Sequence, residues 1–93
     1  MVVLVGEVQL HLPESGSLKA KRQVLNSLKE RLRGRFNLSV AEVDGADLWQ
    51  RSTLAMAVVS TETRHAEAVL TKAVRFIEGD HRVEILDYSV ERW

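Results

Sequence analysis

The sequence contains no cysteine, a single proline and few aromatic residues. The absence of cysteine excludes disulfide bonds and thiolate metal sites. No apolar run approaches the roughly 18 residues that predict a membrane-spanning helix. The first residues also lack the basic start and the small-residue cleavage site of a secretory signal. We therefore expect a cytoplasmic protein.

The length and composition are those of one small globular domain. The chain has 93 residues, of which 45% are apolar and 28% are charged, and these values are typical of a soluble protein. A chain of this size buries roughly 60–65% of the surface that its unfolded form exposes, which is enough for a modest core. We expect a single domain over residues 1–93.

Charge is distributed unevenly along a chain whose formal net charge is zero. Between residues 17 and 35 only Glu30 opposes seven of the thirteen lysines and arginines. This segment is therefore near +6, and the rest of the chain is near −6. The seven cationic residues are Lys19, Lys21, Arg22, Lys29, Arg31, Arg33 and Arg35.

Hydrophobic periodicity predicts four strands and two helices. Apolar residues form continuous runs or alternate in the strands, and they recur every three to four residues in the helices. The strands are expected at residues 2–12, 36–44, 52–61 and 82–93. The helices are expected at residues 18–33 and from 61 or 63 to 78. Gly34 is expected at a left-handed end of the first helix, and Gly79 ends the second.

The order of these elements, βαββαβ, predicts an α+β fold. Two right-handed crossovers joined by a hairpin-like link give a four-stranded antiparallel sheet with both helices on one face. This arrangement is the ferredoxin-like plait. Continuous apolar runs place the first and third strands in the centre. A phase slip after Val40 indicates a bulge, which is commonest near the edges of a sheet, and a slip after Ile85 indicates a second bulge or an edge strand with two apolar faces.

The face of this sheet without helices should be polar, because it would face water. The central strands instead have apolar residues on both faces, and exposed apolar patches of this kind mark interfaces. We therefore expect a second copy of the chain to cover the open face and form a homodimer. The alternative is that loops or the last strand fold over it. The residues expected at the dimer face are Val3, Val5, Ala55, Ala57 and Val59.

Few residues have the spacing of a catalytic or metal site. His11, His65 and His81 fall on different elements, so we expect no metal. The chain has no nucleophile elbow and no glycine-rich phosphate loop. Glu42 and Asp44 could form an acid pair or a site for an arginine, but surface charge that meets the basic helix is the simpler explanation. We expect no catalytic residues, no cofactor and no enzyme activity.

The first helix is the candidate binding surface. Ser15 or Ser17 can cap its start, and capped helix starts with nearby cations are typical of anion sites. The candidates for binding RNA or another anion are Ser15, Ser17, Lys19, Lys21, Arg22, Lys29, Arg31 and Arg33. Four of them follow one another at spacings of three, seven and four, which places them along one face; they are Lys19, Arg22, Lys29 and Arg33. The alternative is that the helix is only solvated or pairs with the acidic remainder of the chain.

Two stretches of the chain are distinctive together. They are L-P-E-S-G-S-L-K-A-K-R-Q-V-L-N-S-L-K-E-R-L and F-N-L-S-V-A-E-V-D-G-A-D-L-W-Q. They resemble the YlxP-like family of small bacterial proteins of unknown function, and the resemblance covers nearly the whole chain. The matching positions are Ser15, Ser17, Leu18, Lys19, Lys21, Arg22, Ser27, Phe36, Asn37, Ser39, Ala41, Glu42, Asp47, Leu48, Trp49 and Gln50.

This resemblance implies a ferredoxin-like fold, in agreement with the order of the elements. Members of the family are often encoded beside translation and ribosome-maturation factors, which implies a translation-linked role. No catalytic residues are established for the family, so none can be transferred to this chain. The roles of the matching positions, including Glu42 and Trp49, stay open.

We therefore expect a binding module that contacts ribosomal RNA or a ribonucleoprotein through its basic first helix. The central strands lack the aromatic side chains on which RNA-recognition motifs stack bases, so contact through the sheet is not expected. One alternative is a homodimeric interaction module with an acidic protein partner. Another is a small anion-binding regulator or enzyme that uses the start of the helix, with Ser15, Ser17, Lys19, Lys21 and Arg22.

Overall fold

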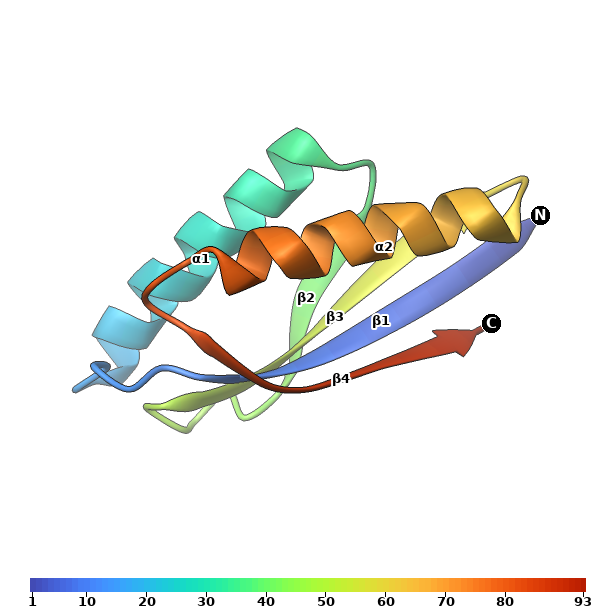
Figure 1. Cartoon of the computed structure of the whole chain (residues 1–93). Coiled ribbons are helices and arrows are strands. Elements are labelled where there is room, and N and C mark those ends of the chain that lie inside the picture. The colour runs from blue at the N-terminus through green and yellow to red at the C-terminus, as the bar shows by residue number, and fades with distance from the viewer.

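The computed structural model describes all 93 residues and contains four strands and two helices in the predicted order (Figure 1). The strands are β1 (Val2–His11), β2 (Ser39–Asp44), β3 (Arg51–Ser60) and β4 (Glu84–Arg92). The helices are α1 (Leu18–Arg35) and α2 (Thr63–Glu78). This order confirms the predicted ferredoxin-like α+β plait.

The sheet has the strand order β2-β3-β1-β4, and every pair of neighbours is antiparallel. The two central strands pair without interruption from Val2 opposite Ser60 to His11 opposite Arg51. Both helices cover the same face, with α2 over the central strands β1 and β3 and α1 over the edge strand β2 (Figure 1). The predicted positions of central and edge strands are therefore confirmed.

Both predicted bulges occur in the edge strands. The pairing of β2 with β3 shifts between Glu42 and Asp44, which is slightly later than the phase slip predicted after Val40. The pairing of β4 with β1 shifts so that Leu86 has no direct partner. Each extra residue bends its strand and changes which side chains face the helices.

Alternating side chains of the central strands form the core together with the inner faces of the helices. Even-numbered residues of β1 and β3 point toward the helices, and their apolar members are buried there. Burying one such side chain stabilises the fold by about 1.5–3 kcal/mol. The side chains that are fully buried include Val8, Leu10, Leu28, Leu32, Leu54, Met56, Leu70 and Ile77.

The opposite face of the sheet is open and partly apolar. Direct pairing of Val3 with Val59 and of Val5 with Ala57 joins these side chains into one strip, which Ala55 extends. Four of the five are partly exposed, and 62% of the surface of Val59 is accessible. The alternative in which the last strand folds over this face is wrong, because β4 pairs beside β1 at the edge of the sheet.

The two helices do not end as their glycines predict. Helix α1 continues through Gly34 to Arg35, and the backbone N–H of Phe36 donates to the carbonyl oxygen of Leu32. The predicted left-handed end at Gly34 is therefore wrong. Gly79 does end α2, but its backbone stays right-handed, and positive φ occurs at Gly45 alone. Neither helix has the length and apolar character needed to cross a membrane.

Candidate binding surface at the start of helix α1

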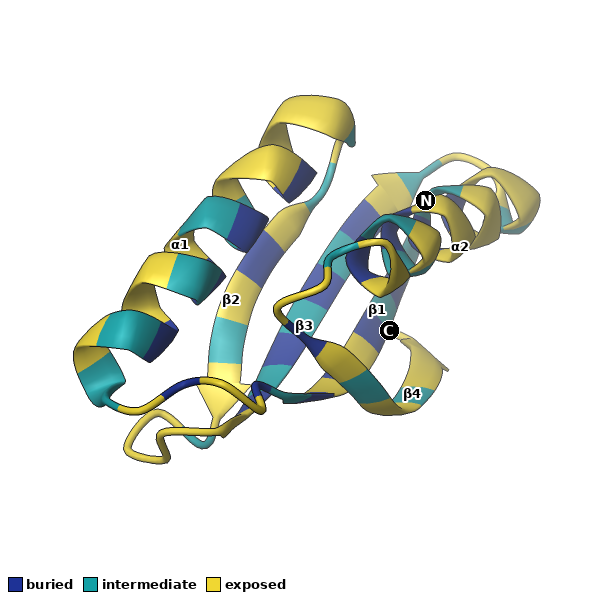
Figure 2. Ribbon diagram, turned by 60° about the vertical axis from the view of Figure 1, so that its left-hand side comes forward, coloured by how far each residue is buried: buried dark blue, intermediate teal, exposed yellow.

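Two loops meet beside the start of α1. The β1–α1 loop (12–17) and the β2–β3 loop (45–50) lie side by side below the first turn of the helix, and both are largely exposed (Figure 2). The backbone N–H of Leu12 donates to the carbonyl oxygen of Gln50 at 2.9 Å. The side-chain amide of Gln50 donates to the carbonyl oxygen of Ser15 at 3.2 Å. The two stretches that resemble the YlxP-like family are thus in contact.

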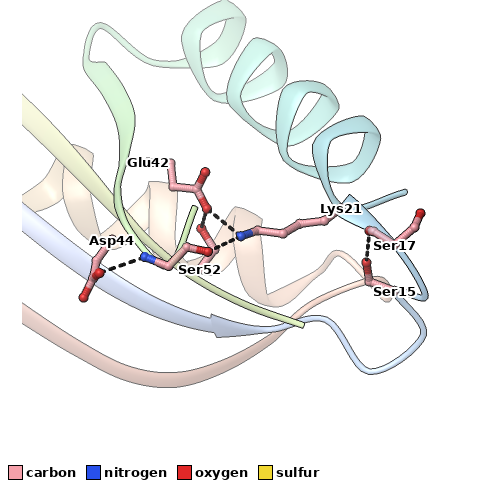
Figure 3. Close-up of polar contacts among 7 residues, drawn as sticks. Ser15, Ser17, Lys21, Glu42, Asp44 and Ser52 are labelled. Carbon is pink, nitrogen blue, oxygen red and sulfur yellow. Dashed lines mark hydrogen bonds and ion pairs between the residues drawn. The ribbon is translucent and has the colours of Figure 1, made fainter. Parts of the chain in front are cut away.

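A buried lysine connects the helix to the second loop. Lys21 is only 1% exposed, and its ammonium group lies 2.9 Å from a carboxylate oxygen of Glu42 on β2 (Figure 3). The same ammonium group donates to the carbonyl oxygen of Gly45. The hydroxyl of Ser52 donates to the same Glu42 oxygen at 2.7 Å. These contacts fix the first turn of α1 against the end of β2.

The prediction that Lys21 contacts phosphates is therefore wrong. Lys21 lies four residues before Leu25 and seven before Leu28, so helical periodicity places it on the inner face with these leucines. Glu42 meets the basic helix, as the simpler explanation of the acidic residues predicted. Asp44 is not its partner in an acid pair, because its carboxylate accepts from the backbone N–H of Gly45 at 2.8 Å.

The two serines at the start of α1 have internal partners. The hydroxyl of Ser17 caps the helix by accepting from the backbone N–H of Ala20 at 3.0 Å. Ser15 is buried, and its hydroxyl donates to the carbonyl oxygen of Ser17 at 3.2 Å. The capping prediction is confirmed for Ser17. The hydroxyl of Ser15 thus has an internal partner, and Ser15 borders a cavity beside the β1–α1 loop, so its role as an anion contact stays a prediction.

Four cations of α1 form a line on the outer side of the helix. We call this set the outer cationic line; it consists of Lys19, Arg22, Lys29 and Arg33. The guanidinium of Arg33 donates to the carbonyl oxygen of Val40 at 2.9 Å, which places the line on the side of the edge strand β2. No member of the line forms an ion pair. The line therefore has no acidic partner within the protein, although Arg33 uses part of its guanidinium on Val40 and Lys29 is half-buried.

The other two cations of α1 point toward α2. The guanidinium of Arg35 lies 4.8 Å from the centre of the Phe76 ring, within the range of a cation–π contact. Arg31 is exposed, and its charge helps to lower the pKa of the Asp80 carboxyl, although a hydrogen bond from Arg82 is the main cause. Arg31 was among the predicted RNA contacts, but it does not belong to the outer cationic line.

A cavity of about 340 Å³ lies on the α2 side of the β1–α1 loop. Leu12 contributes to its apolar wall, and Glu14, His81 and Arg82 contribute its polar groups. The guanidinium of Arg82 donates to the carboxylate of Asp80 through hydrogen bonds of 2.9 and 2.7 Å. These hydrogen bonds raise the pKa of Arg82. The guanidinium is thus largely paired within the loop. No three histidine or acidic side chains gather in a possible metal site anywhere in the structure.

The β2–β3 loop exposes two large apolar side chains that the sequence patterns did not assign. Leu48 is 48% exposed and Trp49 is 56% exposed. A cavity of about 170 Å³ lies next to them, between this loop and the first residues of β3. Contacts between residues more than 20 positions apart bring this loop to the start of α1, and no local pattern predicts such contacts.

Comparisons with known proteins give relatives but no activity. The model of a family described as "Protein of unknown function (DUF503)" matches residues 3–90. The chain is similar to the uncharacterized protein YlxP of Bacillus subtilis, with 33% identity over 78 residues. That alignment covers 84% of this chain and 85% of the relative. Neither description names a ligand, partner or reaction.

Proposed function

Because the chain belongs to the DUF503 family of proteins of unknown function, we propose its role from its own geometry: a non-enzymatic module that binds structured RNA. The RNA would belong to the ribosome or to another ribonucleoprotein, in keeping with a translation-linked role. The outer cationic line would contact its phosphates. Of the four other expected contacts, Ser15 and Lys21 are buried, Ser17 caps the helix, and Arg31 lies on the side of α1 that faces α2.

One observation carries this proposal: four cations follow one side of α1 with no acidic partner. At 1.5 Å per residue, the line from Lys19 to Arg33 is about 21 Å long. Phosphates of a folded RNA occur at intervals along such a distance, and neutralising them releases counterions. A neutral protein lacks a general attraction for RNA, so binding would depend on this one surface.

The test compares charge reversal on the two helices. In the first variant, Lys19→Glu is combined with Arg22→Glu on α1. In the matched control, Arg64→Glu is combined with Lys72→Glu on α2, where both side chains are also exposed. Affinity for fragments of ribosomal RNA would be measured by fluorescence anisotropy at several salt concentrations. We expect the α1 variant to lose at least tenfold in affinity and the control to lose much less.

Salt dependence gives the second readout. The logarithm of the affinity should fall linearly with the logarithm of the salt concentration, with a slope that corresponds to roughly three or four phosphate contacts. Affinity that does not depend on salt, or that the α1 variant retains, would contradict the proposal. Binding to an acidic protein that survives nuclease treatment would favour the alternative partner.

A second candidate function is self-association through the open face of the sheet. The strip of Val3, Val5, Ala55, Ala57 and Val59 contains no charged side chain, so it offers nothing to a polyanion. A second copy presents the same apolar strip and would remove both from water. This face lies opposite the helices, so a dimer would leave the outer cationic line free.

Sedimentation at micromolar concentration tests this second candidate. We expect a dimer for the unchanged chain and a monomer for Val5→Glu, because the substitution places a charge in the middle of the strip. Lys72→Glu, at an exposed position of α2 on the opposite side of the sheet, is the control and should stay dimeric. A monomer for the unchanged chain would overturn this candidate and leave the RNA proposal unaffected.

A further inference from the structure

The β2–β3 loop is held at both of its ends. At its start, Gly45 has a φ of +78°, and its carbonyl oxygen accepts from both the backbone N–H of Leu48 and the ammonium group of Lys21. At its end, the backbone and side chain of Gln50 bind the β1–α1 loop. A loop with these contacts has little freedom to rearrange, so the backbone that carries the side chains between its ends is held in place.

The side chains presented in this way are Leu48 and Trp49. Single exposed apolar residues are common on protein surfaces, so exposure alone would assign nothing to them. Here two large neighbours, 48% and 56% exposed, project from a loop that a buried ammonium group anchors. An aromatic side chain held in place loses little entropy on binding, and tryptophan is enriched among residues that dominate binding energy.

The loop also lies next to the first charges of the outer cationic line. Lys21, which holds the loop, is in the same turn of α1 as Lys19 and Arg22. Those two side chains are exposed, and helical spacing puts them on the same side of α1 as Arg33, which bonds to β2. A strand of RNA that passes along the outer cationic line would therefore reach the β2–β3 loop at the N-terminal end of α1.

Charge at this end of the molecule does not favour further phosphate contacts. The cations Lys19, Arg22 and Arg51 are balanced here by three acidic side chains; these are Glu14, Asp44 and Asp47. An uncharged part of the RNA suits this end better than another phosphate does. The uncharged part that fits an exposed indole is the flat face of a base, and stacking of this kind tolerates any sequence.

We propose that Trp49 stacks on an unpaired base of the RNA whose phosphates lie on the outer cationic line. This inference rests on the proposed function and makes it more specific. A base within a perfect duplex is already stacked on both sides, so it cannot offer its face to Trp49. The RNA must therefore carry a bulge, a loop or an open end next to the contacted helix.

Two RNA hairpins test this inference, one with a perfect stem and one with a single unpaired nucleotide in the stem. The protein carries Trp93→Phe, so that Trp49 is its only tryptophan. We expect tighter binding of the bulged hairpin and quenching of Trp49 fluorescence on binding. Trp49→Ala should weaken binding of the bulged hairpin about 5- to 100-fold and leave the perfect stem nearly unchanged. Trp49→Phe should retain part of the preference, since it keeps an aromatic face.

Trp93→Ala is the matched control, because Trp93 is even more exposed, at 77%, and follows β4 at the other end of the molecule. It should leave both affinities unchanged. If both hairpins bind equally and Trp49→Ala changes neither affinity, stacking is overturned, while sensitivity to the α1 charge reversal would still support RNA binding. A pull-down from nuclease-treated lysate tests the other outcome. If the unchanged chain captures a protein there and Trp49→Ala does not, the loop binds a protein and the inference is overturned.

Discussion

The two helices lie on the same face of the sheet but are held there by different interactions. Helix α2 covers the central strands with an entirely apolar inner face; its buried residues are Ala66, Leu70, Ala73 and Ile77. Helix α1 covers the edge strand β2, and its buried residues include a charged one; they are Lys21, Leu25, Leu28 and Leu32. Apolar burial alone holds α2 on the sheet. In α1, a buried ion pair acts together with apolar burial.

The ion pair in α1 contributes little to the stability of the fold but determines where the helix lies. A buried ion pair adds little net stability, because removing two charges from water offsets most of their attraction. It does fix direction, because Lys21 must reach both Glu42 and Gly45. The pair therefore sets where the first turn of α1 lies relative to the β2–β3 loop. We infer that α2 mainly stabilises the fold and that α1 positions a surface.

Removing Lys21 should have the largest effect on stability. Lys21→Ala leaves the Glu42 carboxylate and the carbonyl oxygen of Gly45 without their cation and should lower the free energy of unfolding by about 3 kcal/mol. Lys72→Ala, at an exposed position of α2, should change it by less than about 0.5 kcal/mol. Urea denaturation of both variants measures this contrast.

A double variant separates the charge from the packing. Combining Lys21→Met with Glu42→Leu removes both charges and fills their space with apolar groups, so it should recover much of the loss. If Lys21→Ala cost less than about 1 kcal/mol, the ion pair would not hold α1, and the contrast between the helices would fail.

Glycine substitutions should have smaller effects, and they should differ in sign. A Cβ added at Gly6 would lie 3.2 Å from Tyr88 and 3.4 Å from Leu70 of α2, so Gly6→Ala should destabilise the protein by about 1 kcal/mol. A Cβ at Gly34 in α1 would meet nothing within 4 Å. Gly34→Ala should therefore stabilise it by about 0.5–1 kcal/mol. Thermal unfolding of the two variants should show shifts in opposite directions, and equal shifts would contradict the close packing of α2 at Gly6.

The helix caps should give effects of about the same size as the glycines. Ser17→Ala removes the hydrogen bond to Ala20 and should cost about 1 kcal/mol. At the start of α2, the side chain of Glu62 makes no capping bond, so Glu62→Ser should add up to about 1 kcal/mol. Denaturation midpoints for the two variants measure the difference. A loss on Glu62→Ser would show that the Glu62 carboxylate already stabilises this end through the helix dipole.

The fold could be predicted from the sequence because its main determinants are local. Alternating and continuous apolar runs predict all four strands, and the phase slips after Val40 and Ile85 predict irregular edge strands, the first slightly before its observed bulge. Gly34 predicts a helix end that the structure does not have, because Phe36 packs against the core and the helix extends toward it. Tertiary packing there overrides the preference of a single residue.

The candidate surface was predicted less completely, for two physical reasons. Lys21 was grouped with the exposed cations because of its charge, although its spacing from Leu25 and Leu28 already placed it on the inner face. On β2, Glu42 lies two residues after buried Val40, so the alternation of the strand already placed it on the same inner face. The position of Trp49 had no such signal, because it depends on contacts between segments distant in sequence.

The hydrogen bond from Arg33 to Val40 has a consequence for the behaviour of the protein at high concentration. Strand β2 ends the sheet, and an open edge invites another chain to add as an extra strand and begin aggregation. Arg33 occupies the carbonyl oxygen in the first half of this short strand and places a positive charge beside it. Every copy carries the same charge at the same place, so two β2 edges repel each other. A cation offered here as a phosphate contact thus also keeps the unbound protein from forming strand-to-strand aggregates.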